Sequence, residues 1–295
     1  MFSRRTRERL REALLGMRFR QMIFDDHLAV SRLGNGRWLA EHPELAEPGF
    51  QAPFNEYEFS RYSQNGEDGL ILFLLSRVGV GPRFVVEVGT QDGRECNSAN
   101  LLLNYGWRGC LLEAEPRWVE RARSYFAECG AEARVRVVQA EVTPENVNDL
   151  LRDAGVPADF ELVSIDIDSF DYWVWEALDF VTPPIVVIEY NASFGPTASV
   201  TVPYDGSSFS SSSPFWHGAS LTALERLGRR KGYALVGVDT KGVNAFFVRR
   251  DVLDRTGLAA VEPAAAFRPH HRRGRRHPPE KQARAIAELP VTEVE

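Results

Sequence analysis

The sequence is poor in cysteine and has no long uninterrupted hydrophobic run. Its three cysteines, Cys96, Cys110 and Cys129, are scattered and show no C-x-x-C spacing. This pattern predicts reduced, partly buried thiols. The arginine-rich start is not followed by the apolar segment of a signal peptide, and no apolar run approaches the roughly 20 residues of a membrane-spanning helix. Together these features predict a cytoplasmic protein without a membrane span.

An excess of positive charge is also missing. The 295 residues include 35 Lys and Arg against 41 Asp and Glu, a net charge of −6. Nucleic acid is therefore not expected as a partner of the whole molecule, and a small-molecule substrate is favoured. A hydrophobic content of 44% is ordinary for a globular protein. The length suits one large domain with extensions.

Strands and helices alternate through the middle of the chain, which predicts an α/β fold with a mostly parallel sheet. The predicted helices cover residues 98–105, 117–129, 144–154, 172–180 and 221–231. The last two strands form a hairpin. Seven strands are predicted in this Rossmann-like arrangement, at residues 84–88, 109–113, 135–140, 161–167, 185–190, 234–239 and 245–249.

Changes in composition along the chain divide it into three regions. Residues 1–60 are predicted to be a helical extension and connector, with a basic helix at 4–23 that packs on the main domain or on a second subunit as a homodimer. A helix on a membrane surface or an acidic partner is the alternative. Residues 61–258 form the main domain. Residues 259–295 are rich in Pro and Arg, and we expect a flexible tail or a peripheral strap, with binding of an anionic substrate or nucleic acid as the less favoured alternative.

The turn after the first strand is the most informative motif. The strand ends in Glu87 and is followed by Gly89 and Gly93, an E-x-G-x-x-x-G pattern rather than the G-x-G-x-x-G of dinucleotide-binding proteins. Glycine lets the backbone bend sharply and approach a ligand. The pattern resembles the first motif of class I S-adenosylmethionine-dependent methyltransferases. A tight strand-to-helix turn in another α/β protein is the alternative.

Several residues near this turn are candidates for binding the cofactor. The backbone at Gly89, Thr90 and Gly93 would approach its amino-acid tail and ribose. Glu87 and Asp92 would hold the ammonium group or an ordered water.

Acids after the second and third strands are further candidates. Glu113 can accept hydrogen bonds from both ribose hydroxyls, with Glu115 as the second choice and a solvated loop acid as the alternative. Glu141 would lie near the adenine amino group.

Polar residues end the fourth and fifth strands, where ligands lie in such sheets. Alternation places Asp166 and Asp168 on one face, and Asp168 is a candidate catalytic residue. Asp166, Glu189 and Asn191 could hold Mg²⁺ or another divalent cation, similar to the Asp…Asp-Asn site of catechol-type O-methyltransferases. In the metal-free alternative, Asp166 contacts the cofactor, and Glu189 and Asn191 bind the substrate.

The loop at 191–220 is long enough to be a lid. His217 lies where it meets the next helix, and imidazole can accept a hydroxyl proton near neutral pH. His217 is therefore the predicted general base, and an exposed or capping histidine is the alternative. Tyr204 is a candidate substrate contact.

A family resemblance joins these motifs over residues 60–250. The chain resembles FkbM-type methyltransferases in the segments YSQNGED, FVVEVGTQDG, LLEAEP, SIDIDSFDYW and VVIEYN. The resemblance implies that Gln64 and Glu67 border S-adenosylmethionine and that Glu113 is the second-strand acid. It also implies O-methylation of a sugar, glycoside or other small natural product in bacterial secondary or envelope metabolism. An amine, carboxylate or peptide acceptor, or a non-catalytic binding protein, are the alternatives.

Overall fold

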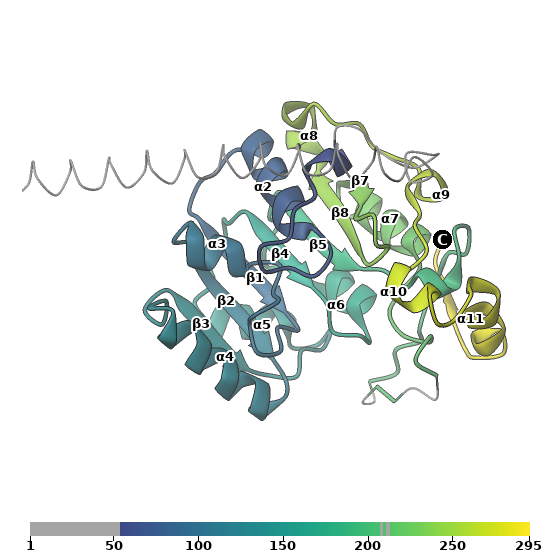
Figure 1. Cartoon of the computed structure of the whole chain (residues 1–295), viewed down its shortest axis with the longest axis horizontal. Coiled ribbons are helices and arrows are strands. Elements are labelled where there is room, and N and C mark those ends of the chain that lie inside the picture. Colours follow the sequence, from purple (N-terminus) through teal and green to yellow (C-terminus); the bar gives the residue numbers. More distant parts are fainter. Residues whose placement is uncertain (1–53, 207–208, 211–212) are drawn as a thin grey trace, which may run out of the picture.

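A seven-stranded sheet forms the centre of the molecule. The computed structural model describes residues 54–206, 209–210 and 213–295, so the predicted basic helix at 4–23 lies outside the described residues. The strand order is β3-β2-β1-β4-β5-β8-β7, and β8 alone runs antiparallel to its neighbours (Figure 1). The predicted fold class is thereby confirmed. The strands are β1 (Phe84–Val88), β2 (Arg108–Glu113), β3 (Val135–Gln139), β4 (Leu162–Ile165), β5 (Ile185–Glu189), β7 (Tyr233–Val238) and β8 (Asn244–Arg249).

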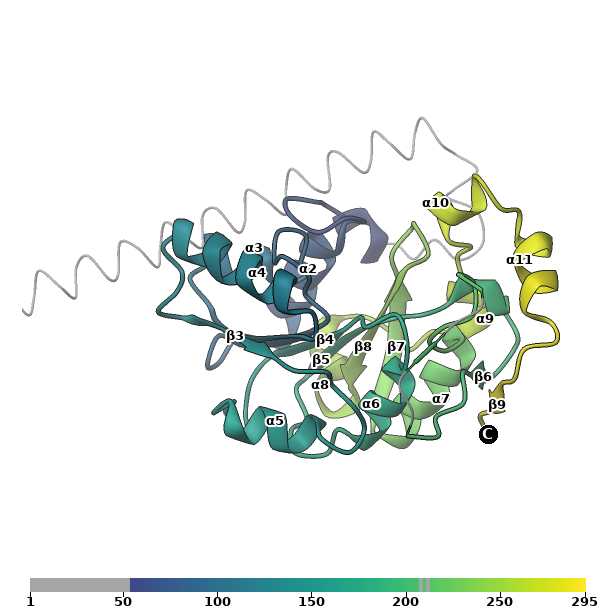
Figure 2. The ribbon, with the colours of Figure 1, turned by 90° about the horizontal axis from the view of Figure 1, so that it is seen from below.

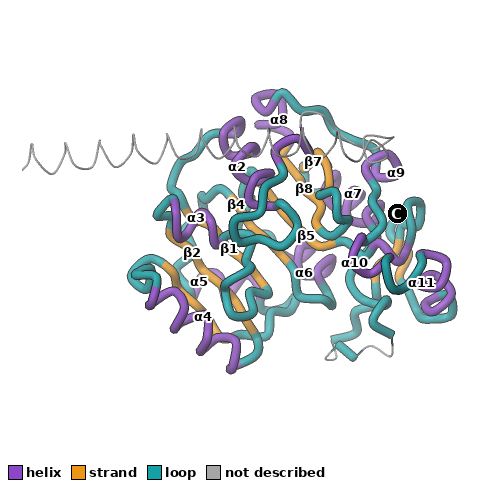
Figure 3. The backbone as a smooth tube through the Cα atoms, viewed as in Figure 1, coloured by secondary structure: helices purple, strands orange, loops and turns teal. Residues whose placement is uncertain are grey.

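Helices cover both faces of this sheet, because its central strands are apolar on both sides. Figure 2 shows α2, α3 and α4 on one face and α5, α6 and α7 on the other, and Figure 3 shows the strands enclosed by helices. Two hydrophobic clusters fill the spaces between the layers. The helices are α2 (Glu67–Val78), α3 (Ala99–Asn104), α4 (Pro116–Glu128), α5 (Val147–Asp153), α6 (Asp171–Ala177), α7 (Leu221–Arg230) and α8 (Arg250–Thr256).

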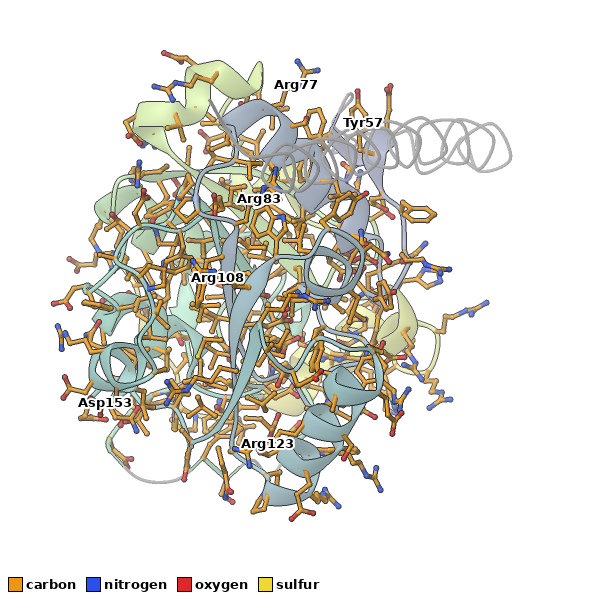
Figure 4. All side chains as sticks on the ribbon, turned by 90° about the vertical axis from the view of Figure 1, so that its left-hand side faces the viewer. Tyr57, Arg77, Arg83, Arg108, Arg123 and Asp153 are labelled. Carbon is orange, nitrogen blue, oxygen red and sulfur yellow. The ribbon has the colours of Figure 1, made fainter. Side chains whose placement is uncertain are left out.

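Side chains also seal the margins of the sheet. The Arg123 guanidinium of α4 donates to the Val137 carbonyl of edge strand β3 at 2.9 Å (Figure 4). The buried Glu161 carboxylate accepts from the backbone N–H groups of Arg83 and Phe84 at 3.1 and 3.0 Å. Glu161 was predicted to begin the fourth strand, but its side chain holds the segment that leads into β1, and β4 begins at Leu162.

The segment after residue 259 packs on the domain as a strap rather than extending as a free tail. Tyr190 donates its hydroxyl proton to the Arg268 carbonyl at 2.7 Å, and Ser193 donates to Gln282 at 2.7 Å. These contacts exist because the tail has buried positions, including Gln282 and Ile286, between its exposed arginines. The strap contains α9 (Pro263–Ala266), α10 (His271–Gly274), α11 (Pro279–Ile286) and β9 (Thr292–Glu293), and β9 pairs with β6 (Val200–Thr201).

Short 3-10 helices complete the description, at η2 (Phe54–Tyr57) and η3 (Ala192–Phe194). Tyr57 of η2 stacks on Phe73 of α2 with ring centroids 4.2 Å apart, which fixes the start of the described chain against the domain. Within the residues that the structure describes, no helix is long and apolar enough to cross a bilayer.

Candidate functional site

A cavity of about 1340 Å³ lies at the carboxyl ends of the parallel strands, where ligands bind in open α/β sheets. The loops after β1, β2, β3, β4 and β5 all reach it, and the strap closes another side. Most of the predicted site residues line this cavity, although the sequence alone does not show which side chains come together in the fold. They are Gln64, Glu67, Glu87, Gly89, Thr90, Asp92, Glu113, Glu115, Glu141, Asp166, Asp168, Glu189 and Tyr204.

The bend after β1 is built by a glycine in a left-handed conformation. Gly89 has φ +83°, and a Cβ there would lie 1.7 Å from the Asp166 carbonyl oxygen. Glycine is thus required by the close approach of the chain after β4 as well as by the turn. Beside it, the Thr90 hydroxyl is buried and has no hydrogen-bond partner among the described residues. That oxygen is a polar group available to a ligand in the cavity.

The second glycine of the motif has a packing role instead. Gly93 does not line the cavity. A Cβ at this position would lie 2.6 Å from the Phe126 ring of α4, and φ is +78°. Gly93 therefore allows α4 to pack closely against this turn, and its predicted contact with a cofactor stays a prediction.

Glu87 ends β1 as a buried acid. Its carboxylate accepts from the backbone N–H groups of Asn97 and Ser98, both at 2.8 Å. Burial raises the pKa of Glu87 from 4.5 to about 7, although these hydrogen bonds oppose the rise. A cationic group in the cavity would compensate this burial, which fits the predicted contact with an ammonium group.

Glu113 at the end of β2 connects the bend after β1 with the bend after β2. One carboxylate oxygen accepts from the Gln91 N–H at 2.7 Å, and the other accepts from the Glu115 N–H at 2.9 Å. Each oxygen can accept a further bond, so a diol could still bind. Glu115 is exposed and lies 3.6 Å from Arg117, which favours Glu113 over Glu115 as the ribose ligand.

The polar segment before α2 also reaches the cavity. Buried Glu67 accepts from the Asn65 N–H at 2.7 Å and from the Asn244 side chain at 2.8 Å. Gln64 is exposed and donates to Glu95 at 2.7 Å. Both line the cavity, and Glu67 is bound by the protein's own amides.

The acids after β4 do not follow strand alternation, because β4 ends at Ile165. Asp168 has φ +54° and an exposed side chain, whereas Asp166 lies deeper. Burial raises the pKa of Asp166, and the charges of Asp168 and Asp171 add to the effect. Burial likewise raises the pKa of Glu189 at the end of β5. Both carboxyls therefore favour the protonated form, and Asp168 is the acid most open to solvent.

His217 is buried behind these acids and does not line the cavity. Its Nε2 lies 3.1 Å from the Arg273 guanidinium, which can only donate, so Nε2 accepts and Nδ1 carries the proton. Burial, followed by the charge of Arg273, lowers the pKa of His217 to about 4. Neither ring nitrogen is open to a substrate hydroxyl. This arrangement does not favour the predicted role of His217 as general base, which stays a prediction.

Asn191 also differs from its prediction. Its side-chain amide donates to the Phe215 and His217 carbonyls at 2.8 Å, and its oxygen accepts from Ser193 and Arg273. It does not line the cavity. These bonds hold the segment of Phe215 and His217 in place and occupy both ends of the Asn191 amide, and its predicted roles toward substrate or metal stay predictions.

Among the residues that the structure describes, one cluster offers ligand atoms for a divalent cation, but it is not the predicted set. Asp168, Glu189 and His217 each offer one ligand atom, and these atoms lie within 4.8 Å of one another. The His217 Nδ1 atom is buried and lacks a hydrogen-bond partner among the described residues. However, a nitrogen that carries a proton has no lone pair for a metal, and Arg273 enforces that tautomer.

Aromatic side chains form the wall beside the lid. Tyr204 lies edge-on to Phe170 with ring centroids 4.7 Å apart, and its hydroxyl donates to Glu145 at 2.5 Å. Phe209 contacts Phe170 and stacks on Trp216 at 5.6 Å. Phe170, Tyr204 and Phe209 thus line the cavity together, and the substrate contact of Tyr204 stays a prediction.

The strap supplies cavity-lining residues that were not among the predicted site residues. Five of them line the cavity, together with Lys241 from the turn between β7 and β8. The dense positive charge in FRPHHRRGRRHPP was visible, but nothing in it indicated where the segment packs. The five are His270, His271, Arg272, Arg273 and Arg275.

Comparisons with known proteins reach only the fold. No family model matches this chain, and no curated protein is similar to it in sequence. Among solved structures, it is similar to cofactor-bound Rv0187 from MTB, with 21% identity, 66% of this chain and 84% of that chain covered, and a TM-score of 0.40. An O-methyltransferase from Bacillus cereus in complex with SAH gives 16% identity, 76% and 88% coverage, and a TM-score of 0.41.

A third solved structure is the O-methyltransferase TomG from Streptomyces achromogenes, in complex with SAM. It is 21% identical over 63% of this chain and 80% of that chain, with a TM-score of 0.40. Identities and TM-scores this low describe a general likeness of fold and carry no argument about activity. The functional argument therefore depends on the cavity itself.

Proposed function

We propose that this protein is an S-adenosylmethionine-dependent methyltransferase that methylates a hydroxyl group of a small molecule, such as a sugar, a glycoside or a related metabolite. One observation carries the proposal. At the carboxyl ends of β1 and β2, the bend at Gly89, the free hydroxyl of Thr90 and the acids Glu87 and Glu113 all border one cavity. In this set, Glu113 is the proposed partner of a ribose diol and Glu87 that of an ammonium group. The Gly89 bend and the Thr90 hydroxyl offer polar groups to the rest of the ligand.

The donor set also fits the charge of the proposed cofactor. When bound, S-adenosylmethionine supplies a methyl group on a sulfonium, which passes to the hydroxyl oxygen as the carbon–sulfur bond breaks to leave S-adenosylhomocysteine. Glu87 and Asp166 bring carboxyl groups to this side of the cavity, and a cationic ligand there would favour their ionised forms.

Asp168 is the residue that we propose as acceptor of the hydroxyl proton. It lines the cavity, its side chain is 76% exposed, and it lies 3.9 Å from the protonated Nδ1 of His217. His217 would then act as a positioning residue that stabilises the carboxylate. The chain's further contribution is to align the acceptor with the donor and exclude water beneath the lid.

The arrangement around Arg273 favours metal-free chemistry. Arg273 provides a positive charge that lowers the pKa of Glu189, although burial outweighs it, and it blocks the His217 tautomer that a metal would need. Treatment with a chelator, followed by re-addition of Mg²⁺, should leave turnover unchanged. Loss of turnover that Mg²⁺ restores would assign the Asp168–Glu189–His217 cluster to a cation.

Calorimetry on the full chain tests the proposal directly. S-adenosylmethionine and S-adenosylhomocysteine should bind with one site each, whereas NAD should not. Glu113→Gln should weaken both by about tenfold or more, since it replaces a charged acceptor by an amide. Failure of the wild-type chain to bind either adenosyl ligand would refute the function.

Transfer of a labelled methyl group to a panel of hydroxylated acceptors tests the catalytic assignment. Asp168→Asn should reduce turnover by about 10² or more while retaining the affinity for S-adenosylmethionine. Asp149→Asn is the matched control, because Asp149 pairs with Arg152 on the surface, away from the cavity. Equal turnover in the two variants would remove Asp168 from the mechanism.

A further inference from the structure

The strap forms a basic wall of the cavity, whose lining also includes the acids at the ends of β1 and β2. The strap lies far from the β1 bend in the sequence, and both line the same cavity only in the fold. We define the basic wall as Lys241, His270, His271, Arg272, Arg273 and Arg275.

The wall is fixed in place by backbone contacts rather than by its charges. His271 donates its N–H to the Lys241 carbonyl at 2.7 Å. Gly242 has φ +73°, and a Cβ there would lie 2.5 Å from the Pro269 carbonyl, so the strap backbone lies directly against this turn. The Arg268 carbonyl accepts from the Tyr190 hydroxyl. The arginines that follow are therefore carried on an anchored segment.

Two arginines of the wall have no acidic partner among the described residues. In the parts of the chain that the structure describes, Arg272 and Arg275 make no ion pair with a carboxylate and no side-chain hydrogen bond. Arg273 binds the neutral atoms Asn191 Oδ1 at 3.1 Å and Ser193 Oγ at 3.2 Å. Its guanidinium has five N–H groups, so donors remain for a ligand.

The positive charges of the wall also act on the histidine beside them. Burial, followed by the charges of Arg273 and Arg272, lowers the pKa of His270 to about 4. The wall therefore holds several positive charges with neutral histidines between them. A negative group placed among them would relieve the repulsion between these charges.

The cavity has room for a second ligand beside the proposed cofactor. Its volume of about 1340 Å³ exceeds the range of roughly 300–1,000 Å³ that is usual for one drug-sized molecule. The aromatic side chains of Phe170, Tyr204 and Phe209 lie on its lining with the strap residues. They offer flat apolar surface to the ring of an acceptor.

We infer that the methyl acceptor carries an anionic group, a phosphate or a carboxylate, which the basic wall binds while the hydroxyl faces Asp168. This inference rests on the proposed function and narrows its substrate class. Arginine is suited to the role because its planar fork binds phosphate and carboxylate through paired N–H groups. The anionic group is not altered in the reaction; it fixes the orientation of the acceptor.

Calorimetry on the full chain loaded with S-adenosylhomocysteine tests the inference with three probes. Glucose 6-phosphate carries a phosphate, glucuronate carries a carboxylate, and glucose carries neither. At least one anion should bind at least tenfold more tightly than glucose, and the stronger of the two identifies the group. If neither anion binds more tightly than glucose, the inference is overturned.

Paired charge removals locate the binding. Arg272→Gln with Arg275→Gln should weaken the better anion by about tenfold or more, since each charged hydrogen bond is worth at least that much. Arg276→Gln with Arg284→Gln removes the same charge from exposed strap residues outside the cavity lining and should change the affinity less than twofold. Equal losses in the two double variants would indicate general attraction and overturn the site.

Two readouts separate this inference from the proposed function. Affinity for S-adenosylhomocysteine should be equal in both double variants, since the acids hold that ligand. If the adenosyl ligand fails to bind while the anion still binds at the wall, the proposed function fails and the anion site stands. In NMR titrations, saturating anion should raise the pKa of His270 from about 4; an unchanged value would place the anion elsewhere.

Discussion

Replacing Glu87 by glutamine should make the stability of the protein less dependent on pH. Glu87 has a pKa of about 7 in the folded chain, against an ordinary value of 4.5. Each pKa unit is worth 1.36 kcal/mol, so ionising this buried carboxyl costs about 3 kcal/mol of folding free energy. Because the folded state holds the proton more tightly, the stabilising contribution is complete below pH 4.5 and is lost as the pH rises through about 7.

Glutamine cannot ionise but keeps one oxygen for the N–H groups of Asn97 and Ser98. At pH 4 the variant should be less stable than the wild type by about 1–3 kcal/mol, because one buried donor loses its acceptor. Between pH 4 and pH 8 the stability of the variant relative to the wild type should rise by about 3 kcal/mol.

Urea unfolding of both chains at several pH values measures the difference, and subtraction cancels every other titrating group. Glu115→Gln serves as the control for removing an exposed carboxylate. A difference between the wild type and Glu87→Gln that stays constant from pH 4 to pH 8 would show that burial does not raise this pKa.

Three further outcomes are expected. Gly89→Ala should destabilise the fold by about 3 kcal/mol or more in urea unfolding, because it adds a backbone clash to the strain of a left-handed conformation. The control Gly257→Ala, at φ +68° with no atom within 4 Å, should cost about 1 kcal/mol. Similar losses of stability in the two variants would dismiss the contact with Asp166. Arg273→Ala should raise the pKa of His217 above about 4 in NMR titrations, since it removes a neighbouring charge that lowers it; an unchanged value would contradict the pairing. The same variant should also gain affinity for Mn²⁺ in calorimetry, and no gain would show that Arg273 is not what blocks a metal.

Local pattern was enough to predict the sheet and one half of the site. Apolar runs of four to seven residues separated by helical segments fix the strands, and all seven appear within two residues of their predicted ends. The ligand edge of such a sheet follows from its topology. Glu87, Thr90 and Glu113 could therefore be placed beside one cavity from their positions at strand ends.

The roles of individual side chains depend on neighbours that are distant in the sequence. Gly93 and Asn191 occupy predicted positions, but Phe126 of α4 and the carbonyls of the lid segment take up their contacts. His217 lies outside the cavity lining and contacts Arg273, which follows it by 56 residues in the sequence. Short-range periodicity contains no information about such pairs, since they form only when packing brings the segments together.

The strap is the clearest example of this division. Its sequence specifies high positive charge and little apolar surface, properties that are equally typical of a free tail. A few buried anchors, such as Gln282 against Ser193 and the Arg268 carbonyl against Tyr190, fix it on the domain. The chain's local chemistry thus specifies the sheet and its acidic bends, whereas the basic side of the cavity exists only because long-range packing offsets the entropy of ordering that segment.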